Sequence, residues 1–332
     1  MLHLLPTEII IEILKNLKIT DLIKIQRVNK LFRELSLDVI NQLHIINNTE
    51  KCYDVIQHLD DTTLSKIIKF KYPYPHREIE IDKLKLCISS MTKLVYLHGN
   101  YSDITNDEIR QLYNLEIFDC FYCKSIDNTG IRYLINLTRL DCQFSEINID
   151  GIKLLTNLKY LNCSECKGTM NGIEQLTKLK TLICAGTTLK DSHLKNMTQL
   201  TRLDCQFCDI TDYGLSYMTN LISLNCLSCW KYVTNSGIQR LTNLEELCIM
   251  WCSNVTDVEC LTKLKNLRCS HNENITKIHI DSLTYLDCDD CPLLTNESIA
   301  HLTNLTSLSF NKCEKITDIS SLKLKIHSLV KY

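Results

Sequence analysis

Apolar residues recur along most of the chain at a spacing of about 21 residues. The pattern Leu-x-x-Leu-x-Cys is the clearest form of this repeat, and "TRLDCQF" occurs twice, beginning at Thr138 and at Thr201. Eleven phased copies in one chain indicate a repeat architecture, so residues 92–322 are predicted to form about eleven stacked units. The copies start, 19 to 23 residues apart, at Leu94, Leu115, Leu137, Leu158, Leu179, Leu200, Leu221, Leu244, Leu264, Leu283 and Leu305.

Within a repeat numbered from its first leucine, positions 4 and 6 are apolar and position 9 is Cys, Ser, Thr or Asn. Because side chains alternate along a strand, positions 4 and 6 share one face and are predicted to point inward. The position-9 side chain is predicted to bond a buried backbone group. Thr211 or Asp212 is suited to cap a short helical segment on the other side. No repeat buries its apolar side chains alone, so the units must stack.

The repeat resembles the leucine-rich repeat, L-x-x-L-x-L-x-x-(N/C)-x-L, over about residues 94–322. The resemblance implies an α/β solenoid with short parallel strands on its concave face and short helices or turns on its convex side. It also implies that ligands bind the concave strand face. Residues 323–332 read as a truncated repeat that forms a C-terminal cap.

The N-terminal segment has a different periodicity. In "LLPTEIIIEILKNLKITDLIKIQRVNKLFRELSLD" the apolar residues follow helical spacing, and Pro6 suits a first helical position. Three short amphipathic helices are therefore predicted within residues 1–45. Such a small bundle is marginal by itself. It is suited to bind a partner, and the alternative is a plain helical cap for the repeats.

This segment resembles an F-box. The family's L-P-x-E-(I/L) element corresponds to Leu5, Pro6, Glu8 and Ile9, and a Phe stands at Phe32 where many members have Trp. The resemblance implies that a Skp-family adaptor binds here and links the chain to a cullin–RING ubiquitin ligase. The remaining matched positions are Ile13, Leu14, Leu17, Asp21, Leu22 and Val28. The predicted adaptor contacts are Leu5, Pro6, Ile9, Leu14, Leu17 and Leu22.

Residues 46–91 are the least readable part of the chain. "YPYPH" and Asn47-Asn48-Thr49 interrupt any regular pattern, whereas "TTLSKIIKFKY" has the character of a degenerate coil. We expect a linker helix and one or two irregular repeats that form an N-terminal cap.

Nineteen cysteines invite a chemical interpretation. Cys205, Cys208, Cys226 and Cys229 form two Cys-x-x-Cys pairs at a spacing that zinc sites also show. The repeat period produces the same spacing without a metal, and position 9 also holds Ser145, Thr187 and Asn272. Buried structural cysteines are therefore favoured over a metal site. Cys248 occupies outward position 5 and is the candidate for a reactive thiol.

Charge and motif content bear mainly on what the chain binds. The net charge of −2 gives no electrostatic reason to expect a nucleic acid or a membrane as partner. No catalytic constellation or phosphate-binding loop is recognisable, so neither an enzyme nor a cofactor is predicted. The absence of a signal-peptide pattern predicts a cytoplasmic or nuclear location. The abundance of Ile, Lys and Asn indicates an AT-rich genome. F-box and repeat chains of this kind also resemble those encoded by large DNA viruses, a source that would place this one in host cytoplasm.

Target-binding residues are sought on the predicted concave face, at outward positions 3, 5 and 7 and at the rim position 8. Aromatic side chains and Met on a face that should be polar indicate a binding surface. The alternative is that neighbouring Arg and Asp side chains satisfy one another and that the aromatics pack at the rim. The candidates are Phe121, Tyr122, Arg139, Asp141, Phe144, Arg202, Asp204, Phe207, Met250 and Trp251.

Together these features predict the substrate-recognition subunit of an SCF-type ubiquitin ligase, with the F-box on the adaptor and the repeats on a target protein. The alternative is a leucine-rich-repeat interaction or decoy module that assembles no ligase.

Overall fold

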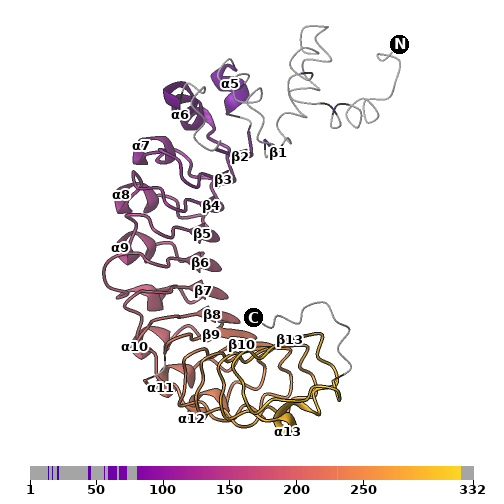
Figure 1. Ribbon diagram of the computed structural model, residues 1–332. Coiled ribbons are helices and arrows are strands. Elements are labelled where there is room, and N and C mark those ends of the chain that lie inside the picture. The colour runs from indigo at the N-terminus through magenta and orange to yellow at the C-terminus, as the bar shows by residue number, and fades with distance from the viewer. Residues whose placement is uncertain are drawn as a thin grey trace. The chain divides into compact units, whose positions relative to one another are not determined.

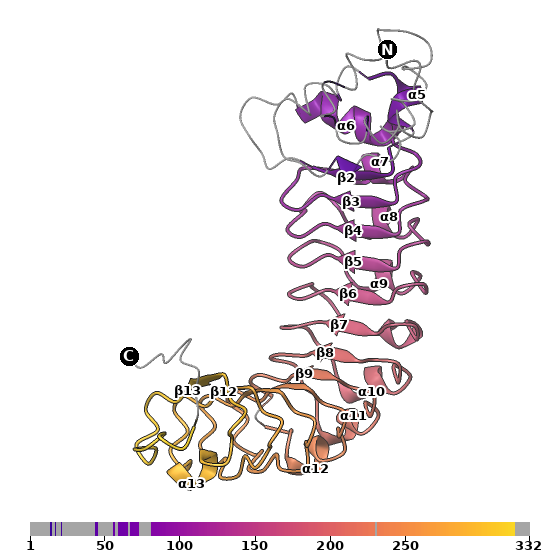
Figure 2. The same cartoon turned by 90° about the vertical axis from the view of Figure 1, so that its right-hand side faces the viewer.

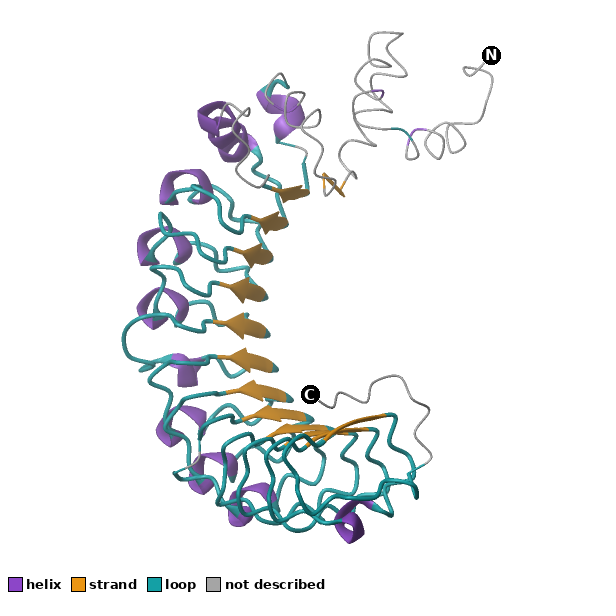
Figure 3. Cartoon of the chain, in the orientation of Figure 1, coloured by secondary structure: helices purple, strands orange, loops and turns teal. Residues whose placement is uncertain are grey.

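The computed structural model describes Leu14, Leu17, Asp21, residues 44–45, Ile56, and residues 59–65, 67–72, 81–229 and 231–322. The chain divides into two compact units, residues 1–158 and 159–332, which we describe separately. In both units short parallel strands lie side by side along one side of the coils, and short helices lie on the other (Figures 1–3). No helix in the described part of the chain is both long enough and apolar enough to span a bilayer.

Unit 1 contains a parallel sheet in the order β1–β2–β3–β4–β5. The predicted linker segment 46–91 contains α5, β2 and the longer helix α6, and β2 pairs with β3 as an additional coil ahead of the first full repeat. The elements of unit 1 are β1 (His44–Ile45), α5 (Asp61–Leu64), β2 (Lys69–Lys71), α6 (Ile81–Ser90), β3 (Tyr96–His98), α7 (Asn106–Ile109), β4 (Ile117–Asp119), α8 (Asn128–Ile131), β5 (Arg139–Asp141) and α9 (Ile149–Ile152).

Unit 2 contains a parallel sheet of eight strands in chain order, β6 to β13. Between β10 and β12, where the repeats shorten to 20 and 19 residues, extended turns joined at Asp257 and Lys277 replace the helix. The elements of unit 2 are β6 (Tyr160–Asn162), the 3-10 helix η2 (Ile173–Gln175), β7 (Thr181–Ile183), α10 (Asp191–Leu194), β8 (Arg202–Asp204), α11 (Asp212–Leu215), β9 (Ser223–Asn225), α12 (Asn235–Ile238), β10 (Glu246–Cys248), β11 (Asn266–Arg268), β12 (Tyr285–Asp287), α13 (Asn296–Ile299) and β13 (Ser307–Ser309).

The strand register aligns the inward positions of successive repeats. Leu203 at position 4 is paired with Leu182 on one side and Leu224 on the other. Leu203 and the position-6 residue Cys205 are both fully buried. Burying one such leucine stabilises the fold by about 1.5–3 kcal/mol. The leucine and cysteine columns therefore form the core, as the alternation of the repeat predicts, and the leucine-rich-repeat solenoid is confirmed.

Position 9 joins one coil to the preceding one through sulfur. The Cys229 Sγ donates to the Cys205 carbonyl at 3.3 Å, and the Cys291 Sγ donates to the Cys269 carbonyl at 3.1 Å. Where position 9 is Thr187, the hydroxyl donates instead to the Cys184 carbonyl of its own coil. The predicted role of position 9 in bonding buried backbone groups is confirmed.

Position 8 has a left-handed backbone in all eleven repeats. Ten of these residues are not glycine and have φ between 53° and 63°, and the eleventh is Gly186. For most residues this conformation costs roughly 1–2 kcal/mol. In nine of the eleven repeats the turn is held because the position-8 N–H donates to a carbonyl of the next coil, as from Phe207 to Leu227 at 3.1 Å. Position-8 side chains are thus projected from a fixed backbone.

The helical side of several coils is tied to the next coil by an Asn or Asp side chain. Thr211 caps α11, and the Asp191 carboxylate of the preceding coil accepts from the Thr211 N–H at 2.9 Å and from its hydroxyl at 2.6 Å. A Cβ on Gly214 would lie 2.3 Å from the same carboxylate. The Gly-Ile step of the repeat therefore leaves room for this side chain.

Candidate functional site

Four of the six predicted adaptor-binding residues lie outside the described residues: Leu5, Pro6, Ile9 and Leu22. Leu14 is 1% exposed, Leu17 is half-buried, and the Leu17 N–H donates to the Leu14 carbonyl at 3.1 Å. This spacing is that of a helical turn, in agreement with the apolar periodicity of the segment.

On the outward side of the strands in unit 1, four aromatic rings form one cluster. Phe121 is at its centre, with ring centroids 4.9 Å from Tyr101 and 5.6 Å from Phe144, both edge to face. The Tyr122 ring lies 5.7 Å from Tyr101 and carries the Lys124 ammonium over its face at 4.6 Å. Tyr101, Tyr122 and Phe144 remain exposed. The rings form a rigid apolar surface suited to a protein partner.

Next to this cluster, Asp119 is the centre of a charged network. Its carboxylate lies 3.4 Å from the Arg139 Nε and 3.5 Å from the His98 Nδ1. Burial acts to raise the pKa of Asp119, but the hydrogen bond with His98 and the positive charge of Arg139 outweigh it, so the pKa lies below its ordinary value. Arg139 thus contacts the carboxylate of the preceding strand, a pairing that sequence reasoning missed.

Asp141 lies beside this network, half-buried on β5. Gln143 donates to its carboxylate at 3.0 Å. Burial raises the pKa of Asp141 despite that hydrogen bond, because the charged form is less well solvated there. Unit 1 thus brings together its five candidates, Phe121, Tyr122, Arg139, Asp141 and Phe144.

In unit 2 the charged candidates are held across several strands. Arg202 on β8 reaches Glu246 on β10 at 3.4 Å, over the small side chain of Ser223 on the strand between them. Asp204 accepts from Gln206 at 3.0 Å and from Asn225 at 3.1 Å. Arg202 and Asp204 therefore each contact residues other than one another, and the Asp204 carboxylate is held by neutral amides.

The apolar candidates of unit 2 are strongly exposed. Phe207 is 62% and Trp251 50% exposed, and Met250 is half-buried beside Trp251. The Trp251 ring stacks on His271 with centroids 4.2 Å apart, and the His271 Nδ1 lies 3.1 Å from the Asp290 carboxylate. His271 and Asp290 were not predicted, although both occupy position 8 and the repeat frame could have identified them.

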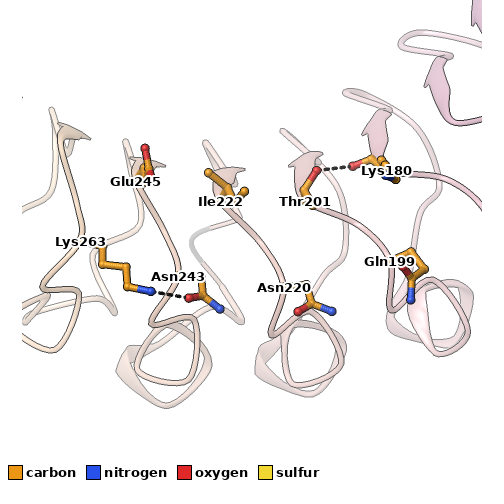
Figure 4. Close-up of a pocket in the computed structure, with 8 residues that line it drawn as sticks. All are labelled: Lys180, Gln199, Thr201, Asn220, Ile222, Asn243, Glu245 and Lys263. Atoms are coloured by element: carbon orange, nitrogen blue, oxygen red, sulfur yellow. Dashed lines mark hydrogen bonds between the residues drawn. The ribbon is translucent and has the colours of Figure 1, made fainter.

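A groove of about 530 Å³ lies on unit 2 beside the starts of the strands (Figure 4). One row of its lining comes from position 2, including the exposed Ile222, and the other from the residue just before each repeat. Asn220 and Asn243 in the second row donate to carbonyls of the preceding coil, at Thr198 and Thr219. The groove is lined by Lys180, Gln199, Thr201, Asn220, Ile222, Asn243, Glu245 and Lys263.

The cysteines of the two Cys-x-x-Cys pairs each point to a separate carbonyl. Cys208 donates to Cys184 at 3.3 Å and Cys226 to Cys248 at 3.4 Å, while Cys205 donates to Asn225 at 3.5 Å. Among the described residues no group of three His, Cys, Asp or Glu side chains is placed to hold a metal ion. The sulfur atoms of the two Cys-x-x-Cys pairs instead join adjacent coils through hydrogen bonds to backbone carbonyls.

Two thiols depart from what their sequence positions indicate. Interaction with the Cys184 side chain lowers the pKa of Cys208 to about 7, although Cys208 is only 5% exposed. Cys248, the predicted reactive thiol, is buried, and burial raises its pKa. That prediction is wrong, because a buried thiol whose pKa is raised holds little of the reactive thiolate.

Comparisons with known proteins agree with this architecture. Residues 2–41 match the F-box-like family. The fold resembles that of an internalin (inlF) from Listeria monocytogenes, with 23% identity and a TM-score of 0.59, over 85% of this chain and 93% of that one. The functional domain of InlJ from the same organism, which includes a cysteine ladder, is 28% identical with a TM-score of 0.52, over 69% and 56%. A search of curated proteins returns no match.

A third similar structure is the Arabidopsis receptor kinase HAESA in complex with the peptide hormone IDA and the co-receptor SERK1. It is 20% identical with a TM-score of 0.52, over 68% of this chain and 44% of that one. The chain therefore combines an F-box-like segment with a leucine-rich-repeat fold.

Proposed function

We propose that the protein is the non-catalytic substrate-recognition subunit of an SCF-type cullin–RING ubiquitin ligase. The observation that carries this proposal is the F-box-like match at residues 2–41, followed along the chain by leucine-rich repeats. The F-box-like segment binds a Skp-family adaptor through the residues predicted from the sequence other than Leu14, which is buried. The strand faces of the repeats bind the target protein.

The chemistry of ubiquitin transfer belongs to other subunits, and this chain contributes proximity. Holding a target near the transfer site raises its effective concentration without any catalytic side chain here. The exposed aromatic side chains on both units support a binding role, because their backbones are fixed and little conformational entropy is lost on binding. If the chain comes from a large DNA virus, the adaptor and the target would be proteins of the host.

Capture of a purified Skp-family adaptor by the full chain tests the proposal. We expect the wild-type protein to retain the adaptor and a Leu5→Ala/Pro6→Ala variant to lose it, with circular dichroism of the repeats unchanged. Phe207→Ala is the matched control and should retain the adaptor, since Phe207 lies in the repeats. Failure of the wild-type chain to bind any adaptor of this family would overturn the proposal.

A further inference from the structure

The outward strand face of unit 2 carries more negative than positive charge. We define it by positions 3, 5, 7 and 8 of the repeats that contain β6 to β13, and call it the acidic face. It has six carboxylates but three arginine or lysine side chains. The carboxylates are Glu165, Asp204, Glu246, Asp287, Asp289 and Asp290, and the bases are Arg202, Arg268 and Lys312.

Neutral donors hold several of these carboxylates in place. Asp289 accepts from the Ser309 hydroxyl at 2.7 Å and from the Asn311 side-chain amide at 2.9 Å, and Asp287 accepts from the Ser270 hydroxyl. Burial acts to raise the pKa of Asp289, but these hydrogen bonds outweigh it and lower the pKa. The donors fix the carboxylates without cancelling their charge, so the negative potential extends toward a ligand.

Apolar anchors lie on the same face. Phe207 and Trp251 are more exposed than expected for such large rings. Met250, next to Trp251 in sequence, is half-buried, as is Leu227, whose carbonyl accepts from the Phe207 N–H. Phe207 and Trp251 have left-handed backbones whose N–H groups donate to the next coil. The rings are therefore presented by a rigid backbone, which favours their use as binding anchors.

We propose that the acidic face binds an extended peptide segment in which arginine or lysine side chains alternate with apolar ones. The apolar side chains of the segment pack on Phe207, Met250 and Trp251, and its cations approach Asp204, Asp287 and Asp289. A cation can also lie over an exposed indole or phenyl ring. This inference rests on the proposed function, since it specifies the class of target that the repeats select, and the same charge disfavours nucleic acids and acidic segments.

Fluorescence anisotropy with a labelled synthetic peptide tests the proposal on the full chain. A peptide of about 12 residues spans roughly 40 Å when extended, comparable with about 34 Å across eight strands. One probe alternates Arg with Leu and Trp, a second has Glu in place of each Arg, and a third is a single-stranded RNA. We expect the basic probe to bind at least about tenfold more tightly than either other probe and to weaken as salt rises.

Variants locate the binding. Asp287→Asn/Asp289→Asn removes two charges while keeping the shape, and should weaken the basic probe about five- to tenfold. Trp251→Ala should weaken it about 30-fold. The matched control Glu297→Gln/Glu314→Gln removes two exposed carboxylates outside the acidic face and should change nothing. Thermal unfolding of each variant identifies any loss of folding.

Three outcomes would overturn the proposal: equal binding of the basic and acidic probes, preference for RNA, or equal losses in the two charge variants. The adaptor-capture experiment on the same preparation separates the two proposals. Specific basic-peptide binding without adaptor capture would refute the ligase role and leave the acidic face supported. Adaptor capture without basic-peptide binding would support the ligase role and refute the proposal for the acidic face.

Discussion

Units 1 and 2 are built from the same repeat but present different outward surfaces. In unit 1 the Asp119 carboxylate is compensated by Arg139 and His98 and lies beside packed aromatic rings. In unit 2 Asp287 and Asp289 are held by hydroxyl and amide donors, which carry no compensating charge. Since both units share the inward columns, the difference between them lies at the outward repeat positions.

The largest expected effect tests whether the two cores are equivalent. Leu140 in unit 1 and Leu203 in unit 2 are both fully buried at position 4. Leu140→Ala and Leu203→Ala should each lower the free energy of unfolding by about 2–5 kcal/mol, because each leaves a cavity in a column of apolar side chains. Urea denaturation measures the loss, and hydrogen exchange shows which unit opens. A loss of unfolding free energy below about 1 kcal/mol in either variant would show that the two cores are not equivalent.

A smaller effect tests the compensated charge of unit 1. Asp119→Asn should lower the free energy of unfolding by about 1–2 kcal/mol at pH 7. Because the folded-state pKa of Asp119 is lowered, its contribution is present above the unfolded value, about 3.9, and is lost as pH falls through the folded value. Urea denaturation of the wild-type protein and of Asp119→Asn, at pH 7 and below pH 3, measures the difference in their free energy of unfolding.

The control for that measurement is Asp107→Asn. Asp107 also contacts an arginine, Arg110 at 3.2 Å, but its side chain is 80% exposed. Asp107→Asn should therefore change the free energy of unfolding little at either pH. A stability difference for Asp119→Asn that does not change with pH would show that the charge of Asp119 is not what stabilises unit 1.

The smallest expected stability effect concerns position 8. Phe207→Gly relieves a left-handed backbone, a gain of roughly 1 kcal/mol, and raises the entropy of the unfolded chain by a similar amount. Net stability should change by less than about 1 kcal/mol, while affinity for the basic probe falls severalfold. Differential scanning calorimetry and anisotropy report the two quantities, and a large loss of stability would mean that the ring is part of the core.

The inward half of each repeat could be predicted from the sequence because its pattern has a single physical solution. A residue such as Leu203 recurs in phase with its neighbours, and only a stacked coil buries them all. The cap at Thr211 and the bonding role of position 9 followed from side-chain chemistry. These features depend on contacts between equivalent positions of adjacent repeats, which the period alone specifies.

The outward surface was harder to predict because its contacts cross strands with unlike residues. The Arg202–Glu246 pair depends on a serine in the intervening strand, and the Arg139–Asp119 pair joins different repeat positions. Periodicity does not say which unlike residues will meet across the strands. The left-handed turn at position 8 was also missed, since Tyr, Phe, Trp and His rarely adopt it without a fixed hydrogen-bond partner.

The Asp191–Thr211 bridge and the space above Gly214 have a consequence for how such a chain can lengthen. A coil of this kind provides the acceptor for its successor and the vacancy for its predecessor. A duplicated block of such coils therefore brings both halves of its internal junctions without any compensating substitution. Growth by copying is open to this architecture, whereas the gain or loss of a fraction of a coil would leave two mismatched ends.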